Sequence, residues 1–364
     1  MSILLSTTLI IIGLAVLIKG ADVFVEQSSQ IAKRLNVSER IIGLTLVAFG
    51  TSFPELSISV IAAVQGSDGL AIGNVVGSNV FNIAAVLGII ALVRPIAVSR
   101  SMVRKDIPMA ILTAFVLLIL LFDTIFTDAT VNTLSRADAM IFLLFFLVFL
   151  YYTFYKSDDG LQNSGCEVRG SEVRHCEGGT TEAIQIASPV ARNDEETIAT
   201  EPAGADVSSV PKKADHHIAK TTTLIILSLA GVLIGGELVV RGGTGLAETF
   251  GMSHVLIGLT IVAIGTSLPE ITTGIIAVLK GKDDIAIGNV VGSCMFNVLF
   301  ILGAAAIIAP MTLTVNILID VILLVVLSIF LYFTARSKGH ISRAEGVFFL
   351  TIYIAYLIFI IHRG

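Results

Sequence analysis

An internal repeat limits what this chain can fold into more than any other feature of its sequence. Shifting the 364-residue chain by 215 positions places residues 42–88 on residues 257–303, with 27 identities in 47 positions and no gap. Two long segments recur: GLTLVAFGTSFPE (Gly43 to Glu55) with GLTIVAIGTSLPE (Gly258 to Glu270), and AIGNVVGSNVFN (Ala71 to Asn82) with AIGNVVGSCMFN (Ala286 to Asn297). The two halves are therefore expected to build the same kind of unit.

The composition places both units in a membrane. The chain is 55% hydrophobic and only 14% charged, whereas a water-soluble protein carries about 25% charged residues. Crossing the hydrocarbon takes about 20 apolar residues. Ten such stretches lie near residues 3–24, 41–64, 70–93, 107–123 and 137–155, and near 222–240, 255–279, 285–309, 314–334 and 345–361.

Ten spans divide into two sets of five, one in each half. Because five is odd, the second unit enters the bilayer from the side opposite to the first. We therefore expect an all-α polytopic membrane protein whose ten transmembrane helices form two inverted-topology five-helix repeats, residues 1–155 and 222–364. This architecture is typical of secondary transporters, with the substrate site at the midplane between the halves.

Residues 156–221 separate the two units and have a different composition. They hold 19 of the 51 charged residues, 12 acidic and 7 basic, with few large apolar side chains. We expect a flexible linker. Cys166, His175 and Cys176 within it are too few and too widely spaced for a structural zinc site. The net charge of −5 also arises in this segment, so it indicates no nucleic-acid partner.

Basic residues predict the orientation in the cell membrane. With the N-terminus outside, 19 of the 23 Lys and Arg residues, including all seven of the linker, lie on the cytoplasmic side. Only Arg136, Arg241 and Arg363 face out, and Lys19 lies inside a span. This bias follows the positive-inside rule and predicts a cytoplasmic linker.

Two glutamates occupy equivalent places in the middle of predicted spans. Glu55 and Glu270 are each preceded by a proline and follow a threonine by four residues, Thr51 and Thr266. An ionisable residue at this depth is costly and is a functional candidate. The alternative is a buried, protonated glutamate that only fixes helix packing.

The prolines predict a break in each of these two helices. Neither Pro54 nor Pro269 donates a backbone hydrogen bond, so the carbonyls four residues earlier, those of Gly50 and Gly265, lose their partner. We expect freed carbonyl oxygens there and also at Ala48 and Ala263. Interrupted helices are tolerated at membrane depth where they line a cavity or bind an ion.

Polar residues also line the next span of each half. Asn74, Ser78 and Asn82 are spaced four residues apart, and Asn289, Ser293 and Asn297 repeat the pattern. That spacing places them on one helical face. Hydrogen bonding between helices is the alternative role for these side chains.

Together these groups predict a site made of oxygen ligands. Carboxylate, hydroxyl, amide and carbonyl oxygens suit hard cations, and Ca²⁺ prefers about 6 to 8 of them in a flexible shell. A charge of +2 also balances two glutamates. Na⁺, which is similar in size, suits the same oxygens.

The paired GTS-x-PE and GN-x-x-GS-x-x-x-N motifs resemble the alpha repeats of the cation/calcium exchanger superfamily, and most of all those of prokaryotic Na⁺/Ca²⁺ exchangers. The resemblance covers the chain except the linker. It implies cation binding by ten residues: Ala48 (carbonyl), Thr51, Glu55, Ser78, Asn82, Ala263 (carbonyl), Thr266, Glu270, Ser293 and Asn297. Sodium-coupled relatives often carry Asp where Asn297 stands, which leaves open whether Na⁺ or H⁺ is the counter-ion.

The function expected from this resemblance is secondary active antiport of Ca²⁺ against Na⁺ by alternating access. Ca²⁺ and Na⁺ are then transported ions, no cofactor is expected, and a monomer would suffice. A Ca²⁺/H⁺ exchanger is the closest alternative, and a cation channel is a more distant one. A membrane hydrolase would need a catalytic motif such as G-x-S-x-G or H-E-x-x-H, which the sequence lacks.

Other acidic residues have simpler explanations. Asp22 and Glu237 are equivalent in the repeat, and each has a basic residue at helical spacing, Lys19 and Arg241. Local ion pairs are expected, with a place on the ion pathway as the alternative. Asp106 and Asp320 lie near predicted helix starts and are expected to act as caps or dipole partners.

Overall fold

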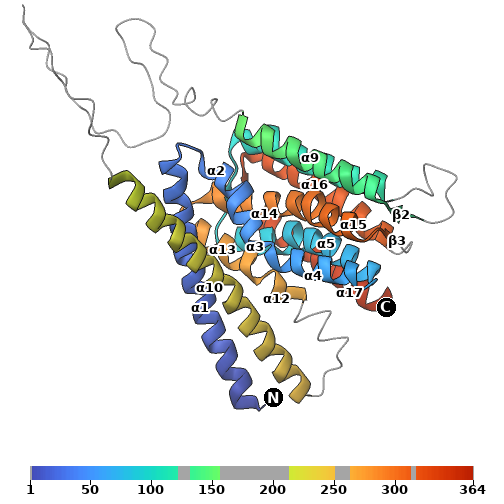
Figure 1. Ribbon diagram of the computed structural model, residues 1–364, viewed down its shortest axis with the longest axis horizontal. Coiled ribbons are helices and arrows are strands. Elements are labelled where there is room, and N and C mark those ends of the chain that lie inside the picture. Colours follow the sequence, from blue (N-terminus) through green and yellow to red (C-terminus); the bar gives the residue numbers. More distant parts are fainter. Residues whose placement is uncertain (1, 122–131, 156–212, 251–262, 313–316, 364) are drawn as a thin grey trace, which may run out of the picture.

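The computed structural model describes residues 2–121, 132–155, 213–250, 263–312 and 317–363 (Figure 1). The first half contains α1 (Ile3–Arg34), α2 (Glu39–Ile42), α3 (Ala48–Thr51), α4 (Phe53–Val64), α5 (Asp68–Phe81), α6 (Leu87–Val93), β1 (Ile96–Ala97), α7 (Ile107–Leu120), β2 (Thr133–Leu134) and α9 (Arg136–Tyr155). Short π-helical segments, Gly43–Val47, Asn82–Val86 and Met102–Asp106, join some of these helices.

The second half repeats this order. It contains α10 (Lys213–Thr249), α12 (Ala263–Thr266), α13 (Leu268–Leu279), α14 (Asp283–Phe296), a π-helical segment (Asn297–Leu302), α15 (Gly303–Ile308), β3 (Met311–Thr312), α16 (Ile317–Lys338), β4 (His340–Ile341) and α17 (Arg343–Arg363). Helix α10 begins inside the range predicted as linker, so residues 213–221 are helical. The predicted linker residues 156–212 and residues 255–262 of the predicted seventh span lie outside the described residues.

Seven of the described helical stretches are long and apolar enough to cross a membrane. An eighth is formed if Glu39–Thr51 and Phe53–Val64, which meet at a bend of 49°, count as one span. Helical residues also occupy Ile107–Leu120 and Leu268–Leu279. The protein is thus an α-helical membrane protein, apart from its two-residue strands.

Burial divides the candidate spans into central and peripheral helices. In Asp68–Val93 and Asp283–Ile308, 83% and 78% of the apolar stretch is buried. The corresponding shares are only 22% for α1, 22% for α9 and 17% for α17. The two polar-lined helices predicted to carry the site therefore lie at the centre, and the apolar outer faces of the others are available to lipid.

Packing follows the sequence repeat, and it joins the two halves. Helix α9 of the first half packs on α15 of the second, and α17 of the second half packs on α6 of the first. Helices α7 and α16, which are equivalent, pack on each other, as do α1 and α10. Each half thus completes its packing with helices of the other half.

Two small antiparallel sheets make the same exchange at the loops. Strand β1 pairs with β4, and β2 pairs with β3. A first-turn aspartate supports a strand in each case: Asp68 Oδ2 accepts the Thr312 N–H at 2.8 Å, and its equivalent Asp283 Oδ2 accepts the Ala97 N–H at 3.0 Å. Each aspartate bonds to a strand of the other half, so it links the two halves.

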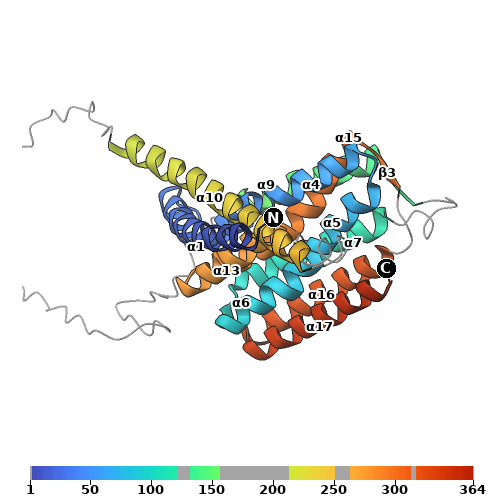
Figure 2. The ribbon, with the colours of Figure 1, turned by 90° about the horizontal axis from the view of Figure 1, so that it is seen from below.

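Glycines allow α1 and α10 to pack with their backbones close together. A Cβ built on Gly235 would lie 2.5 Å from the Leu17 nitrogen, and one on Gly20 would lie 2.9 Å from the Val232 nitrogen. Figures 1 and 2 both show the two helices side by side and inclined away from the remaining helices. Because small residues let membrane helices gain close van der Waals contact, α1 and α10 form a tightly joined pair.

This close approach predicts a difference between two glycines of α10. Gly235→Ala should destabilise the protein by about 1–3 kcal/mol because the new methyl group meets the α1 backbone. Gly231→Ala is the matched control, since its Cβ would have no neighbour nearer than 3.7 Å. Thermal unfolding in detergent measures both variants. Equal midpoints for the two would contradict the close backbone contact.

Candidate cation site

The helices that carry the glutamates break one residue before the Phe-Pro or Leu-Pro pair. Helix α3 ends at Thr51 and α4 begins at Phe53, with Ser52 between them at φ −83° and ψ 10°. In the second half α12 ends at Thr266 and α13 begins at Leu268, with Ser267 at φ −96° and ψ 8°. The prolines lie in the first turn of the new helices, where a missing N–H costs nothing. The predicted interruption is confirmed in both halves.

The central helices also change geometry at repeated positions. The α-helical hydrogen bonding of α5 gives way to a π-helical segment at Asn82, and that of α14 does so at Asn297. π-Helical turns are rare and occur often at functional sites. The asparagines predicted as ligands therefore sit where the helix is locally widened.

Glu55 and Glu270 lie close together in the centre of the molecule. Each is 1% exposed, and their charges are near enough to repel one another. Serines from the two breaks cross between the halves: Ser52 Oγ lies 3.5 Å from Glu270 Oε1, and the Ser267 hydroxyl bonds to Glu55. Each half therefore places its serine beside the glutamate of the other half.

Several oxygens in this region have no hydrogen-bond partner among the described residues, although all are buried. They are Glu55 Oε2, Glu270 Oε2, Asn82 Oδ1, Asn297 Oδ1 and Ser293 Oγ. A buried polar atom without a partner costs about 1–3 kcal/mol. All five belong to predicted ligands, and four form two repeat-equivalent pairs. Oxygens in such a set suit a hard cation.

The remaining predicted ligands differ in how deeply they are buried. Thr51 is fully buried and donates to Asn289 Oδ1 at 3.0 Å, and it also lies beside Glu270. Ser78 is 8% exposed, and Thr266 is half-buried at the end of α12. Ala263 is the first residue of α12.

The expectation of a freed carbonyl at Ala48 is wrong for this conformation. The Ala48 oxygen accepts the Ser52 N–H at 3.1 Å, because α3 continues to Thr51 before the helix breaks. A carbonyl has two lone pairs, so a cation would have to use the second one. The carbonyl that Pro54 cannot bond is that of Gly50.

The first asparagine of each stripe bonds between helices. Asn74 Nδ2 donates to the Glu55 carbonyl at 3.2 Å and to Ser59 Oγ at 2.9 Å. It therefore joins α5 to α4, which is the alternative role predicted for these side chains, hydrogen bonding between helices. Its equivalent Asn289 accepts from Thr51, and its Nδ2 has no partner in the described residues.

Asn79 is a polar residue of this region that the sequence pattern did not indicate. Its Oδ1 accepts from Asn297 Nδ2 at 3.0 Å, and its Nδ2 donates to the Cys294 carbonyl at 3.1 Å. Asn79 and Cys294 are equivalent in the repeat, so they meet across the junction of the halves. The bond from Asn297 Nδ2 to Asn79 fixes the orientation of the Asn297 amide, and the other atom of that amide, Oδ1, has no hydrogen-bond partner among the described residues. The available signal was the polar difference between Asn79 and Cys294, one of only two mismatches between the segments 71–82 and 286–297.

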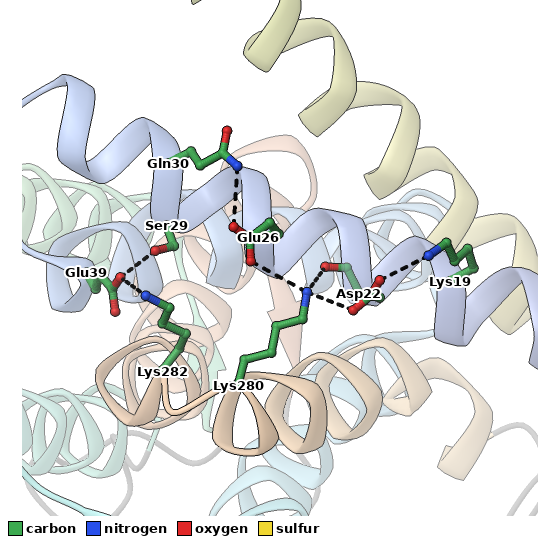
Figure 3. Close-up of polar contacts among 8 residues, drawn as sticks. All are labelled: Lys19, Asp22, Glu26, Ser29, Gln30, Glu39, Lys280 and Lys282. Carbon is green, nitrogen blue, oxygen red and sulfur yellow. Dashed lines mark hydrogen bonds and ion pairs between the residues drawn. The ribbon is translucent and has the colours of Figure 1, made fainter.

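Asp22 and Glu237 form the expected local ion pairs, with Lys19 at 3.2 Å and with Arg241 at 2.6 Å. Asp22 also takes part in a larger cluster that links α1 to the turn between α13 and α14 (Figure 3). Lys280 Nζ lies 2.7 Å from Asp22 Oδ1 and 3.7 Å from Glu26, and Lys282 lies 2.7 Å from Glu39. This cluster holds one end of α1 against the rest of the molecule.

Asp106 lies directly before the first turn of α7, where a negative charge suits the helix dipole, but it makes no capping bond. Its carboxylate forms a buried ion pair with Arg40, at 2.5 Å. The two residues are 66 positions apart in the sequence. The prediction for Asp106 used only its place near a helix start, so it did not include this partner. Asp320 lies in the first turn of α16, where a negative charge suits the helix dipole.

Comparison with known proteins identifies the family. The family described as "Sodium/calcium exchanger protein" matches residues 5–155 and 220–362. The chain belongs to this family. It is therefore a multi-pass membrane protein of the cation/calcium exchanger superfamily, of the prokaryotic type, and its activity is cation/Ca²⁺ antiport rather than an enzymatic reaction.

Relatives cover nearly the whole chain. Sodium/calcium exchanger MaX1 of Methanosarcina acetivorans is 30% identical over 361 residues, 96% of this chain and 97% of that protein. Inner membrane protein YrbG of Escherichia coli is 31% identical over 309 residues, 84% of this chain and 81% of its own. A solved structure of the sodium-calcium exchanger NCX_Mj has a TM-score of 0.75 and 27% identity, covering 98% of this chain and 99% of that one.

The bond between Asn79 and Asn297 predicts a positioning role for Asn79. Asn79→Ala should raise the Ca²⁺ concentration for half-maximal uptake about tenfold, as loss of an outer-shell partner does at metal sites. The maximal rate should change less, because the oxygens themselves remain. Ser57→Ala, an exposed hydroxyl on α4, is the control. An unchanged half-maximal concentration in Asn79→Ala would contradict the role.

Proposed function

We propose that the protein exchanges Ca²⁺ for Na⁺ at a single site between its two halves. Glu55 and Glu270 supply the charge, and Thr51, Thr266, Ser78, Ser293, Asn82, Asn297 and the carbonyls of Ala48 and Ala263 supply further oxygens. The observation that carries the proposal is the set of five buried oxygens without hydrogen-bond partners, which come from both halves and from both predicted motifs. A bound cation would satisfy all of them.

We also propose that ten helices cross the membrane as two inverted repeats, with the N-terminus outside and residues 156–221 cytoplasmic. Contacts between loops support this arrangement. Lys280 and Lys282 contact α1 and Glu39, and β1 pairs with β4. All of these are loops and helix ends predicted to be cytoplasmic. Strands β2 and β3, predicted to be external, pair with each other.

The charge of the site accounts for obligatory exchange. With no cation bound, occlusion would enclose two carboxylates in a medium of low dielectric constant, which costs at least several kcal/mol. One Ca²⁺, or a set of Na⁺ ions, removes that cost. Reorientation is therefore restricted to the loaded forms, and export of one ion depends on return of the other.

The names of the relatives favour sodium over protons as the counter-ion, whereas the proposed ligands do not distinguish between the two. MaX1 is named a sodium/calcium exchanger, and NCX_Mj is called a sodium-calcium exchanger in a study of extracellular ion exchange. The site itself offers two carboxylates, because Asn297 is an amide. A Ca²⁺/H⁺ exchanger would use the same oxygens with the glutamates protonated in the return step.

Neutralising either glutamate tests the site. Glu55→Gln and Glu270→Gln should each abolish Na⁺-driven Ca²⁺ flux in proteoliposomes, because the remaining single charge no longer balances Ca²⁺. Glu237→Gln is the matched control, since Glu237 is half-exposed and paired with Arg241. Near-normal flux in both site variants would refute the assignment.

Ion replacement tests the counter-ion. Vesicles containing the protein are loaded with Na⁺, K⁺ or choline at one fixed pH, and uptake of radiolabelled Ca²⁺ is followed. We expect uptake only with Na⁺ inside, because the Na⁺ gradient supplies the driving force. Uptake driven instead by an imposed pH gradient, and indifferent to Na⁺, would establish the proton exchanger.

A further inference from the structure

A cavity of about 370 Å³ lies between the β1–β4 sheet, the segment that follows β1 and the end of α16. Its polar lining consists of Arg100, Arg104, Arg336 and Tyr332, and Val98 and Val103 contribute apolar walls. None of its lining residues is one of the predicted cation ligands. Its volume falls within the range of small-ligand sites, about 300–1,000 Å³.

Three arginines line this cavity. Arg100 and Arg104 are four residues apart in a helical segment, so they lie on one face, and Arg336 comes from α16. Arg336 Nη1 donates to the Tyr332 hydroxyl at 2.7 Å, and its Cζ lies 5.7 Å from the centre of the Tyr332 ring. Tyrosine thus orients this arginine without neutralising it.

The acidic residues of this region are engaged elsewhere. Asp106 pairs with Arg40 at 2.5 Å, Asp283 with Arg94 at 3.4 Å, and Glu345 accepts from Ser342. In the part of the chain that the structure describes, Arg100, Arg104 and Arg336 make no ion pair. Three like charges around one cavity repel each other, and an anion within it would offset that repulsion.

The chemistry of the lining favours a phosphate group. Guanidinium forks match phosphate oxygens in pairs, and they are less strongly hydrated than lysine ammonium groups. A tyrosine hydroxyl beside them adds a further polar group. A single carboxylate would engage fewer of these donors.

The position of the cavity favours a lipid as the source of that phosphate. Arg336 lies in the last turn of a candidate span, α16, which packs on α7. Both helices carry exposed apolar side chains that suit the bilayer: Leu112, Phe115, Ile119, Ile322, Val326 and Phe333. Tyrosine is enriched where helices leave the hydrocarbon. A headgroup in the cavity would leave its acyl chains along these faces.

We propose that this cavity binds the headgroup of an anionic phospholipid of the cytoplasmic leaflet. Basic pockets between membrane helices on that side recognise such headgroups. The proposal uses the orientation given under Proposed function, but none of the chemistry at Glu55 and Glu270. Loss of lipid binding and loss of Ca²⁺ exchange are therefore separate results.

Native mass spectrometry of the full chain in detergent tests the proposal, with phosphatidylglycerol as the probe and phosphatidylcholine as the zwitterionic comparison. The variant Arg100→Gln/Arg104→Gln should bind phosphatidylglycerol about 30-fold more weakly, from two lost basic contacts. Lys33→Gln/Arg34→Gln is the matched control, because it removes two exposed basic residues at the end of α1. The control should change binding less than twofold.

Two further measurements separate the alternatives. Arg100→Lys/Arg104→Lys keeps the positive charges but removes the paired N–H donors of the guanidinium groups. This variant should lose less affinity for phosphatidylglycerol than the glutamine variant does, and it should keep the wild-type unfolding temperature. Inorganic phosphate, added alone and in competition, tests a soluble source. Equal phosphatidylglycerol binding by all variants, equal losses in the variant and its control, or displacement of the lipid by millimolar phosphate would each overturn the proposal.

Discussion

Two buried carboxylates placed beside each other are the constraint on which the rest of this structure depends. Glu55 and Glu270 are both buried, and when both are ionised they would repel one another in surroundings that solvate charge poorly. They are held there by helices that break at the preceding serines and by central helices that present amide and hydroxyl groups. Such an arrangement is costly without a positive charge, and this cost is what a transporter needs if it is to move only when loaded.

Each half contributes side chains to the surroundings of the other half's glutamate. Ser52 reaches the glutamate of the second half, and Ser267 that of the first. The same exchange recurs in the outer helices and in the two small sheets. The halves differ at Asn79 and Cys294, equivalent positions where the Asn79 amide donates to the Cys294 backbone carbonyl. The two halves therefore do not present identical surroundings to the predicted ligands: Asn297 Nδ2 donates to Asn79 Oδ1, whereas the residue equivalent to Asn79 in the other half is Cys294, which has no side-chain amide.

The sequence predicted those parts of the fold that the repeat and local chemistry determine. Apolar length located the helices, and proline before glutamate located the breaks, because both effects act within a few residues. It did not predict contacts between distant segments. The ion pair of Arg40 with Asp106 and the support of Asn297 by Asn79 depend on which helices become neighbours. The carbonyl of Ala48 was misjudged because the helix continues to Thr51 before it breaks.

The packing of each half on the other has a consequence for biosynthesis. Helix α9 is inserted with the first half, but the surface it packs on, α15, belongs to the second. Likewise α6 packs on α17, which is made after the whole of the first half. Because chains emerge from the N-terminus, the helices of the first half must remain in the bilayer with these packing faces uncovered until their partners in the second half have been made. Lipid, insertion machinery or both have to shelter those faces during that interval.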